Sequence, residues 1–225
     1  NNSSGVDLTL TNINIENGYS SSNGAGIYQS GGALNLVDVS LSDNQSVNHG
    51  AGIYVSGGSV DGDNLYFYNN DSYVHGGGVY ATNSNVALHD TYFKSNSAYS
   101  KGGGIRAWGA DVTLTDTRFY SNGADEDRDE VGGGSAIALD DGSSLSASTL
   151  GTGDYDCEFQ YNWDSADDIG AAILLQDSST ADFDDCDFYE DGSISYDNRY
   201  FDIHNGDSGF WYEYDNTSVF CDAED

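Results

Sequence analysis

The chain has 225 residues, and its six Lys and Arg against 38 Asp and Glu give a formal net charge of -32. Such a charge repels phosphate backbones and anionic lipid surfaces, so we expect no nucleic-acid partner. No apolar run approaches the roughly 18 residues that cross a bilayer, so we expect no direct membrane insertion by this chain. With 29 Gly, 17 Tyr, nine Phe and no Pro, the composition indicates a folded core with many turns, because disordered chains are poor in aromatic residues.

A Gly-rich tetrapeptide recurs along the chain at a constant spacing. The copies GAGI, GAGI, GGGV and GGGI begin at Gly24, Gly50, Gly76 and Gly102, each 26 residues after the last. Looser copies, GSAI and GAAI, begin at Gly134 and Gly170 after acidic, Gly-rich or Ser-rich stretches. The spacing predicts a repeat of 26 residues, with loops inserted between the later repeats.

A second motif, FxxN, keeps the same spacing. Its copies are Leu41 with Asn44, Phe67 with Asn70, Phe93 with Asn96, Phe119 with Asn122, and Phe159 with Asn162. The runs between the motifs alternate apolar and polar residues, which predicts short strands with one buried face. Asn or Asp recurs between these strands, at Asn12, Asp38, Asn64, Asp90, Asp116, Asp156 and Asp185, and these residue types favour bends with left-handed backbone.

One repeat is too small to bury its own apolar face, so the repeats must stack. We therefore predict an all-β fold, a right-handed single-stranded parallel β-helix with about 26 residues per rung, forming a single domain over residues 1–225. Regular rungs are expected over 6–122, rungs with loop insertions over 123–191, and an irregular aromatic rung or cap over 192–225.

Stacking places equivalent residues above one another in columns. One column predicts a structural ladder of side-chain amides that bond from rung to rung: Asn44, Asn70, Asn96, Asn122 and Asn162. Cys157 and Cys186 occupy the same rung position and should meet inside. They are either small core residues or, in an oxidising compartment, a disulfide.

The paired GGxI-like and FxxN motifs, over residues 15–191, resemble the repeat of the polymorphic outer-membrane proteins first known from chlamydiae. The passenger regions of that family look like parallel β-helices that are exported as autotransporters and used in adhesion. The resemblance implies a secreted or cell-surface, extracellular location. Here the first motif is GAGI or GGGI more often than GGAI, and we do not extend the resemblance to membrane attachment.

Two columns of side chains are candidates for binding. Tyr28, Tyr54 and Tyr80, with Arg106 next in line, follow the inward Ile or Val and should form an exposed stripe for a glycan or a protein on a cell surface. Stacking that stiffens the sheet is the alternative. His49 and His75 should stack at an exposed polar corner, where the next residue in the column, Lys101, disfavours a metal ion.

Carboxylates on two acidic segments suit Ca²⁺, which takes six to eight oxygen ligands. The candidates are Asp125, Asp127 and Asp129 in the first segment and Asp184 and Asp185 in the second. Solvated acidic loops are the alternative, because neither an EF-hand loop nor a calcium-binding nonapeptide is present. No other cofactor is expected.

We thus expect a non-catalytic extracellular or cell-surface β-helix that acts as an adhesin or structural fibre module, with the insertions at 123–131 and 140–158 as contact elements. One alternative is a filament subunit that self-associates end to end. Another is a polysaccharide-binding or polysaccharide-cleaving β-helix enzyme. Catalysis is disfavoured because the six basic residues are scattered over a surface that repels acidic polysaccharides.

Overall fold

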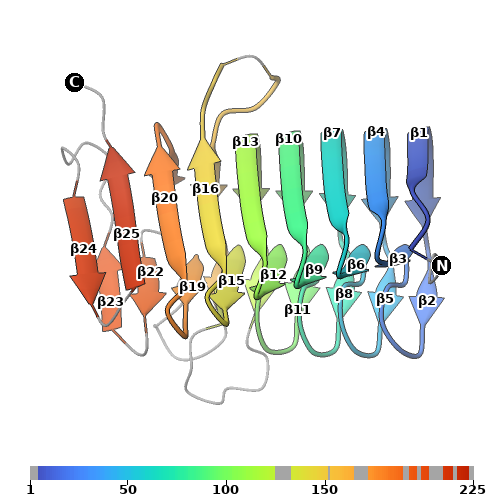
Figure 1. Cartoon of the computed structure of the whole chain (residues 1–225), viewed down its shortest axis with the longest axis horizontal. Coiled ribbons are helices and arrows are strands. Elements are labelled where there is room, and N and C mark those ends of the chain that lie inside the picture. Colours follow the sequence, from blue (N-terminus) through green and yellow to red (C-terminus); the bar gives the residue numbers. More distant parts are fainter. Residues whose placement is uncertain are drawn as a thin grey trace.

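The computed structural model describes residues 5–124, 133–151, 153–164 and 172–189, and the backbone of four later strands, 193–196, 199–202, 210–214 and 217–222. All regular elements within these ranges are β-strands, stacked along one axis with the N-terminal strand at one end (Figure 1). No helix in this part of the chain is long and apolar enough to cross a membrane.

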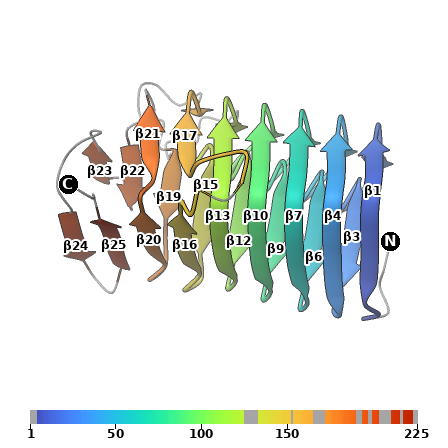
Figure 2. The same ribbon diagram turned by 90° about the horizontal axis from the view of Figure 1, so that it is seen from above.

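The strands form three sheets that run along the stack. Figure 2 shows strands of two of them, an 11-stranded sheet and an 8-stranded sheet. The 11-stranded sheet contains β1 (Leu8–Glu16), β4 (Ala33–Ser42), β7 (Ser59–Tyr68), β10 (Asn85–Lys94), β13 (Asp111–Tyr120), β16 (Ser144–Ser148), β20 (Thr180–Asp184), β25 (Thr217–Asp222) and β24 (Phe210–Tyr214). In the same sheet, β17 (Glu158–Gln160) pairs with β13, and β21 (Asp187–Tyr189) pairs with β17. The 8-stranded sheet contains β3 (Ile27–Ser30), β6 (Ile53–Ser56), β9 (Val79–Thr82), β12 (Ile105–Trp108), β15 (Ile137–Asp140), β19 (Ile173–Leu175), β22 (Ser193–Tyr196) and β23 (Arg199–Asp202). The 6-stranded sheet contains β2 (Tyr19–Ser20), β5 (Gln45–Ser46), β8 (Asp71–Ser72), β11 (Ser97–Ala98), β14 (Gly123–Ala124) and β18 (Trp163–Asp164).

The strand pairing follows the repeat of the sequence. Leu41 pairs with Phe67 in the 11-stranded sheet, and Ile53 pairs with Val79 in the 8-stranded sheet, so parallel neighbours lie 26 residues apart. The register continues across the insertions, where Phe119 pairs with Phe159. The predicted all-β parallel solenoid is confirmed. Among the strands that the structure describes, only the final pairs, β22 with β23 and β24 with β25, are antiparallel.

The bends between strands have left-handed backbone where short polar side chains recur. Positive φ occurs at Asn12, Asp38, Asn64, Asp90, Asp116 and Asp185. The predicted seventh member, Asp156, is not among the residues with positive φ, because the insertion after β16 takes the place of the simple bend. A second column of residues with positive φ, which was not predicted, includes Asp43, Asn69 and Tyr161.

The Gly-rich motif solves two steric problems in each rung. Gly76 has a φ of 67°, a conformation that strains other residues. Gly78 approaches the next rung so closely that a Cβ atom there would lie 2.6 Å from the carbonyl oxygen of Gly104 and 2.9 Å from the Phe93 ring. The first glycine therefore makes the corner, and the third lets the rungs stack.

The core contains a stack of aromatic rings beside a ladder of buried amides. Ring centroids are 4.5 Å apart for Phe67 and Phe93 and 4.7 Å apart for Phe93 and Phe119. In the amide ladder, each Asn Nδ2 donates to the Oδ1 of the next rung: Asn44 to Asn70 at 2.9 Å, Asn70 to Asn96 at 2.8 Å, Asn96 to Asn122 at 3.0 Å and Asn122 to Asn162 at 2.9 Å. The buried amides thus satisfy each other along the axis.

Candidate functional site

A groove runs along the corner between the 11-stranded and 6-stranded sheets. It has a volume of ≈ 790 Å³ and is lined by Asp43, Asn44, Gln45, Asn69, Asp71, Ser72, Tyr73, Ser97 and Tyr99. We call it the corner groove. Its residues come from the ends of β4 and β7, and from β5, β8 and β11 or the residues that follow them, so it spans successive rungs. Figure 1 shows β5, β8 and β11 side by side in the lower half of the stack.

The polar wall of the corner groove is a ladder of outward side chains. Alternation within each short strand turns one residue out, whereas the next, such as Ser46 or Ser72, is buried. Gln45 Nε2 donates to Asp71 Oδ2 at 3.1 Å, and Ser97 Oγ donates to Asp71 Oδ1 at 2.8 Å. The Asp71 carboxylate is therefore held at the centre of the wall.

Two tyrosine rings flank this wall and face solvent. Tyr73 is 51% exposed and Tyr99 is 46% exposed. They stand on adjacent rungs, because β8 pairs with β11 in parallel register. Gln45 Nε2 also donates to the Tyr73 hydroxyl at 3.3 Å, which orients that ring at the groove. Exposed aromatic rings beside polar groups are typical of recognition surfaces.

Further exposed aromatic side chains lie along the same edge. Tyr19 in β2, Trp163 in β18 and Tyr161 just before it are all exposed. Trp163 pairs with Gly123, and its indole ring lies so close to Gly123 that a Cβ atom there would meet it at 2.4 Å. Five of the seven aromatic residues that are exposed in the described part of the chain, Tyr19, Tyr73, Tyr99, Tyr161 and Trp163, thus belong to this edge.

The expected tyrosine stripe lies on the 8-stranded sheet and is largely covered. Tyr28 and Tyr54 stack at 5.1 Å and are half-buried, and Tyr54 stacks on Tyr80 at 5.6 Å. The expectation that Tyr80 and Arg106 are exposed is wrong, since only 9% and 1% of these residues are accessible. Arg106 is buried because it pairs with the Asp140 carboxylate at 2.5 Å.

The histidine column covers part of that stripe, and its expected exposure is also wrong. The ring of His49 stacks on His75 at 5.2 Å and on Tyr80 at 4.5 Å, so both histidines are half-buried. Burial, and then the positive charge of Arg106, lower the pKa of His75 to about 3. The described residues contain no group of three or more His, Cys, Asp or Glu side chains that could hold a metal ion.

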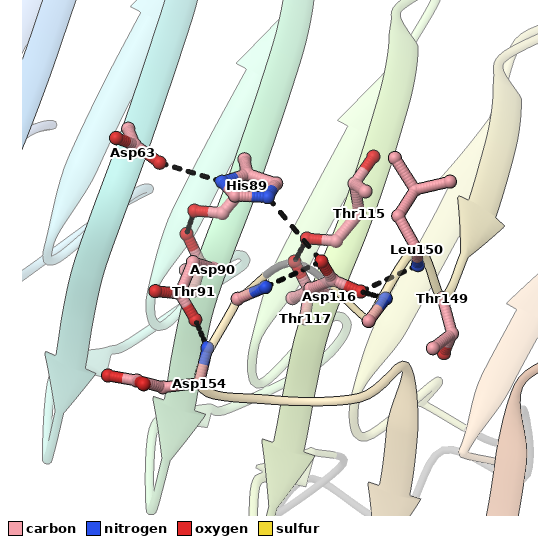
Figure 3. Close-up of polar contacts among 12 residues, drawn as sticks. Asp63, His89, Asp90, Thr91, Thr115, Asp116, Thr117, Thr149, Leu150 and Asp154 are labelled. Carbon is pink, nitrogen blue, oxygen red and sulfur yellow. Dashed lines mark hydrogen bonds and ion pairs between the residues drawn. The ribbon is translucent and has the colours of Figure 1, made fainter.

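A second polar cluster lies where a loop crosses the outer face of β10 and β13 (Figure 3). The buried Asp116 carboxylate accepts backbone N–H groups from Leu150 at 2.7 Å, from Gly151 at 3.0 Å and from Gly153 at 3.0 Å. Asp90 Oδ1 accepts the backbone N–H of Asp154 at 2.6 Å. These bonds fasten residues 150–151 and 153–154, part of the insertion expected as a contact element, to the sheet.

His89 bridges two carboxylates beside this loop. Its Nδ1 lies 2.7 Å from Asp63 Oδ1 and its Nε2 lies 3.4 Å from Asp116 Oδ2 (Figure 3). The hydrogen bond to Asp63, with the nearby carboxylates, raises the pKa of His89. Both oxygens of the Asp116 carboxylate already accept backbone N–H groups of the loop. The cluster therefore suits anchoring of the loop better than acid–base chemistry.

The remaining predicted site residues are the acidic residues and two cysteines, and some of them lie outside the described residues. Asp125, Asp127 and Asp129 lie outside the described residues. Asp184 is exposed at the end of β20, and Asp185 forms the adjacent bend. Cys157 and Cys186 are joined by a disulfide with a Cα–Cα distance of 4.7 Å. Calcium binding by the acidic segments stays a prediction.

One stretch of the chain matches the model of a known repeat family. Residues 90–107 match the model of the Chlamydia polymorphic membrane protein repeat. This stretch contains Phe93 with Asn96 and the Gly-rich motif that begins at Gly102. No curated protein and no solved structure matches the chain. The predicted resemblance to this repeat family is thereby confirmed at residues 90–107.

Proposed function

We propose that the chain is a non-catalytic, cell-surface adhesive rod whose binding side is the corner groove with its neighbouring aromatic edge. The observation that carries this proposal is the pair of exposed rings, Tyr73 and Tyr99, on adjacent rungs of one groove. An adhesive surface needs side chains that bury area on contact and lose little entropy, and tyrosine meets both requirements.

Two further observations support the proposal. A repeat that matches a Chlamydia surface-protein family and a β-solenoid fold are together typical of an adhesin-like β-helix. In the cluster around His89, the Asp116 carboxylate is committed to holding a loop. Binding of a partner on a cell surface therefore fits the exposed groups better than catalysis does.

The test is attachment of beads coated with the chain to cultured cells. Sedimentation first establishes that the protein on the beads is monomeric, so that end-to-end association does not imitate multivalent binding. Wild-type beads should attach, and Tyr73→Ala/Tyr99→Ala beads should attach less. Trp108→Ala is the matched control, because Trp108 is 41% exposed and lies in β12 of the 8-stranded sheet, outside the corner groove. Equal attachment of all three proteins would contradict the proposal.

A further inference from the structure

We infer that the corner groove binds an uncharged glycan chain that runs along the axis of the solenoid. Sugar rings lie on Tyr73 and Tyr99, and their hydroxyl groups bond to the wall formed by Gln45, Asp71 and Ser97. This inference rests on the proposed function, because it names the class of ligand for the same groove.

The aromatic rings supply the first half of the recognition. A pyranose presents flat C–H faces, and an exposed phenol ring covers such a face while its hydroxyl remains able to bond at the edge. Tyr73 and Tyr99 leave about half of their surface open to such a contact. Neither ring makes a stacking contact with another aromatic side chain in the described part of the structure, so their faces are not occupied in that way.

The polar wall supplies the second half. A sugar hydroxyl is both donor and acceptor, so a chain of sugars requires both kinds of group along its path. Asp71 accepts one bond on each oxygen, from Gln45 and from Ser97, and a carboxylate has about four acceptor positions. Further hydroxyl groups can therefore bond to Asp71 without breaking the ladder.

The repeat of the solenoid favours a polymer over a single small molecule. Neighbouring strands lie about 4.8 Å apart, so Tyr73 and Tyr99 offer equivalent contacts at a regular interval along the axis. The exposed rings of Tyr19 and Trp163 belong to the same edge on more distant rungs. A chain of two or more sugars can contact both tyrosines, and a longer one reaches Tyr19 or Trp163, which stand in the same column as Gln45, Asp71 and Ser97.

The charge of the groove decides which glycan fits. Asp43 and Asp71 line it, no Lys or Arg does, and the whole chain carries a net charge of -32. Sulfated chains and chains of uronic acids would be repelled. A basic peptide is the competing occupant, because its cations would pair with Asp43 and Asp71. An uncharged glycan contacts both the faces of the two tyrosines and the polar wall formed by Gln45, Asp71 and Ser97.

The first experiment measures binding of the full chain to immobilised glucans, mannans and xylans, to heparin and polygalacturonate as anionic controls, and to oligolysine as a basic peptide. At least one uncharged glycan should bind, and the anionic controls should not. Binding to oligolysine alone, or to the anionic chains, would overturn the inference.

The second experiment uses variants against the glycan that binds. Tyr73→Ala and Tyr99→Ala should each weaken binding by about tenfold, as expected for the loss of one stacked ring. Trp108→Ala should bind as the wild type does. Thermal melting of each variant shows that it is folded, and unchanged affinity in the double Tyr variant would overturn the inference.

Competition separates this inference from the proposed function. If the Tyr variants reduce attachment of the beads to cells but the glycan does not compete for it, the glycan inference fails although the corner groove is adhesive. If the chain binds the glycan but its beads do not attach to cells, the inference holds and the adhesive function fails.

Discussion

Asn96 Oδ1 accepts two hydrogen bonds from the rung below, one from the Asn70 backbone N–H at 3.1 Å and one from Asn70 Nδ2 at 2.8 Å. Asn96 Nδ2 in turn donates to the Phe67 carbonyl oxygen at 3.0 Å as well as to Asn122. Because all of these groups are buried, no water can replace a missing partner.

Replacement of Asn96 by Ala should therefore destabilise the chain by about 3 kcal/mol, since it leaves buried donors and an acceptor unpaired. Urea unfolding followed by circular dichroism measures this loss. Asn35→Ala is the matched control, because Asn35 makes only a surface contact to Thr9 at 3.5 Å, and its change should stay within about 0.5 kcal/mol. Similar losses for both variants would show that the ladder is not a special source of stability.

Asp116→Asn should release the loop that crosses the outer face of β10 and β13. An amide group has one acceptor atom in place of two, so it cannot hold the three N–H groups that Asp116 holds on both oxygens. The amides of Leu150, Gly151 and Gly153 should exchange with deuterium at least about tenfold faster, equivalent to about 1.4 kcal/mol of lost protection. Asp90→Asn is the control, and it should affect chiefly Asp154.

Reduction of the bond between Cys157 and Cys186 should lower stability. The bond closes a segment with a sequence separation of 29 residues, for which the chain-entropy model gives about 3–4 kcal/mol. Cys157→Ser should therefore unfold at lower urea concentration than the oxidised wild type, and a reducing agent should remove the difference. Counting thiols in the denatured wild type tests the bond itself. The reduced protein should have two more titratable thiols than the oxidised protein, and equal counts would contradict the bond.

The fold was predictable because it depends on one repeated distance. Residues such as Phe67 and Phe93 lie 26 positions apart and stack directly, so spacing alone predicts the interior columns. The same argument anticipates the left-handed bends at Asp90 and Asp116. It cannot anticipate a bend that an insertion replaces, as happens near Asp156.

The surface was harder to predict because exposure depends on what neighbouring columns cover. Tyr80 turns outward, yet His49 and His75 lie over it and bury it. Tyr73 and Tyr99 have the same 26-residue spacing and are exposed, because the short strands that precede them form the edge of the stack. The 26-residue spacing of Tyr73 and Tyr99 was visible in the sequence. Only the structure of the corner shows that this tyrosine column is exposed, whereas the column that contains Tyr80 is covered.

Loss of one partner of the Arg106–Asp140 pair should be more damaging than loss of both. Each side chain is nearly inaccessible, so Asp140→Leu leaves a buried guanidinium without its counter-charge and should cost about 3–5 kcal/mol. The double variant Arg106→Leu/Asp140→Leu replaces the ion pair by apolar groups and should recover much of that loss. A double-mutant cycle from urea unfolding measures the coupling, and strictly additive losses would contradict a buried pair.

His75 should make the chain less stable in mild acid. Burial, with the charges of Arg106, His49 and Lys101, lowers the pKa of His75 from 6.5 to about 3, whereas Asp140 acts in the opposite direction. Below pH 6.5 the unfolded chain binds a proton at this residue that the folded chain does not, so its contribution to stability is complete above the unfolded pKa and is lost as the pH falls towards 3. His75→Phe keeps a stacked ring without a titratable nitrogen. The wild type should therefore lose on the order of 2–3 kcal/mol more than the variant between pH 7 and pH 4. Urea unfolding at both pH values measures the difference, and parallel losses in the two proteins would show that His75 is free to accept a proton in the folded state.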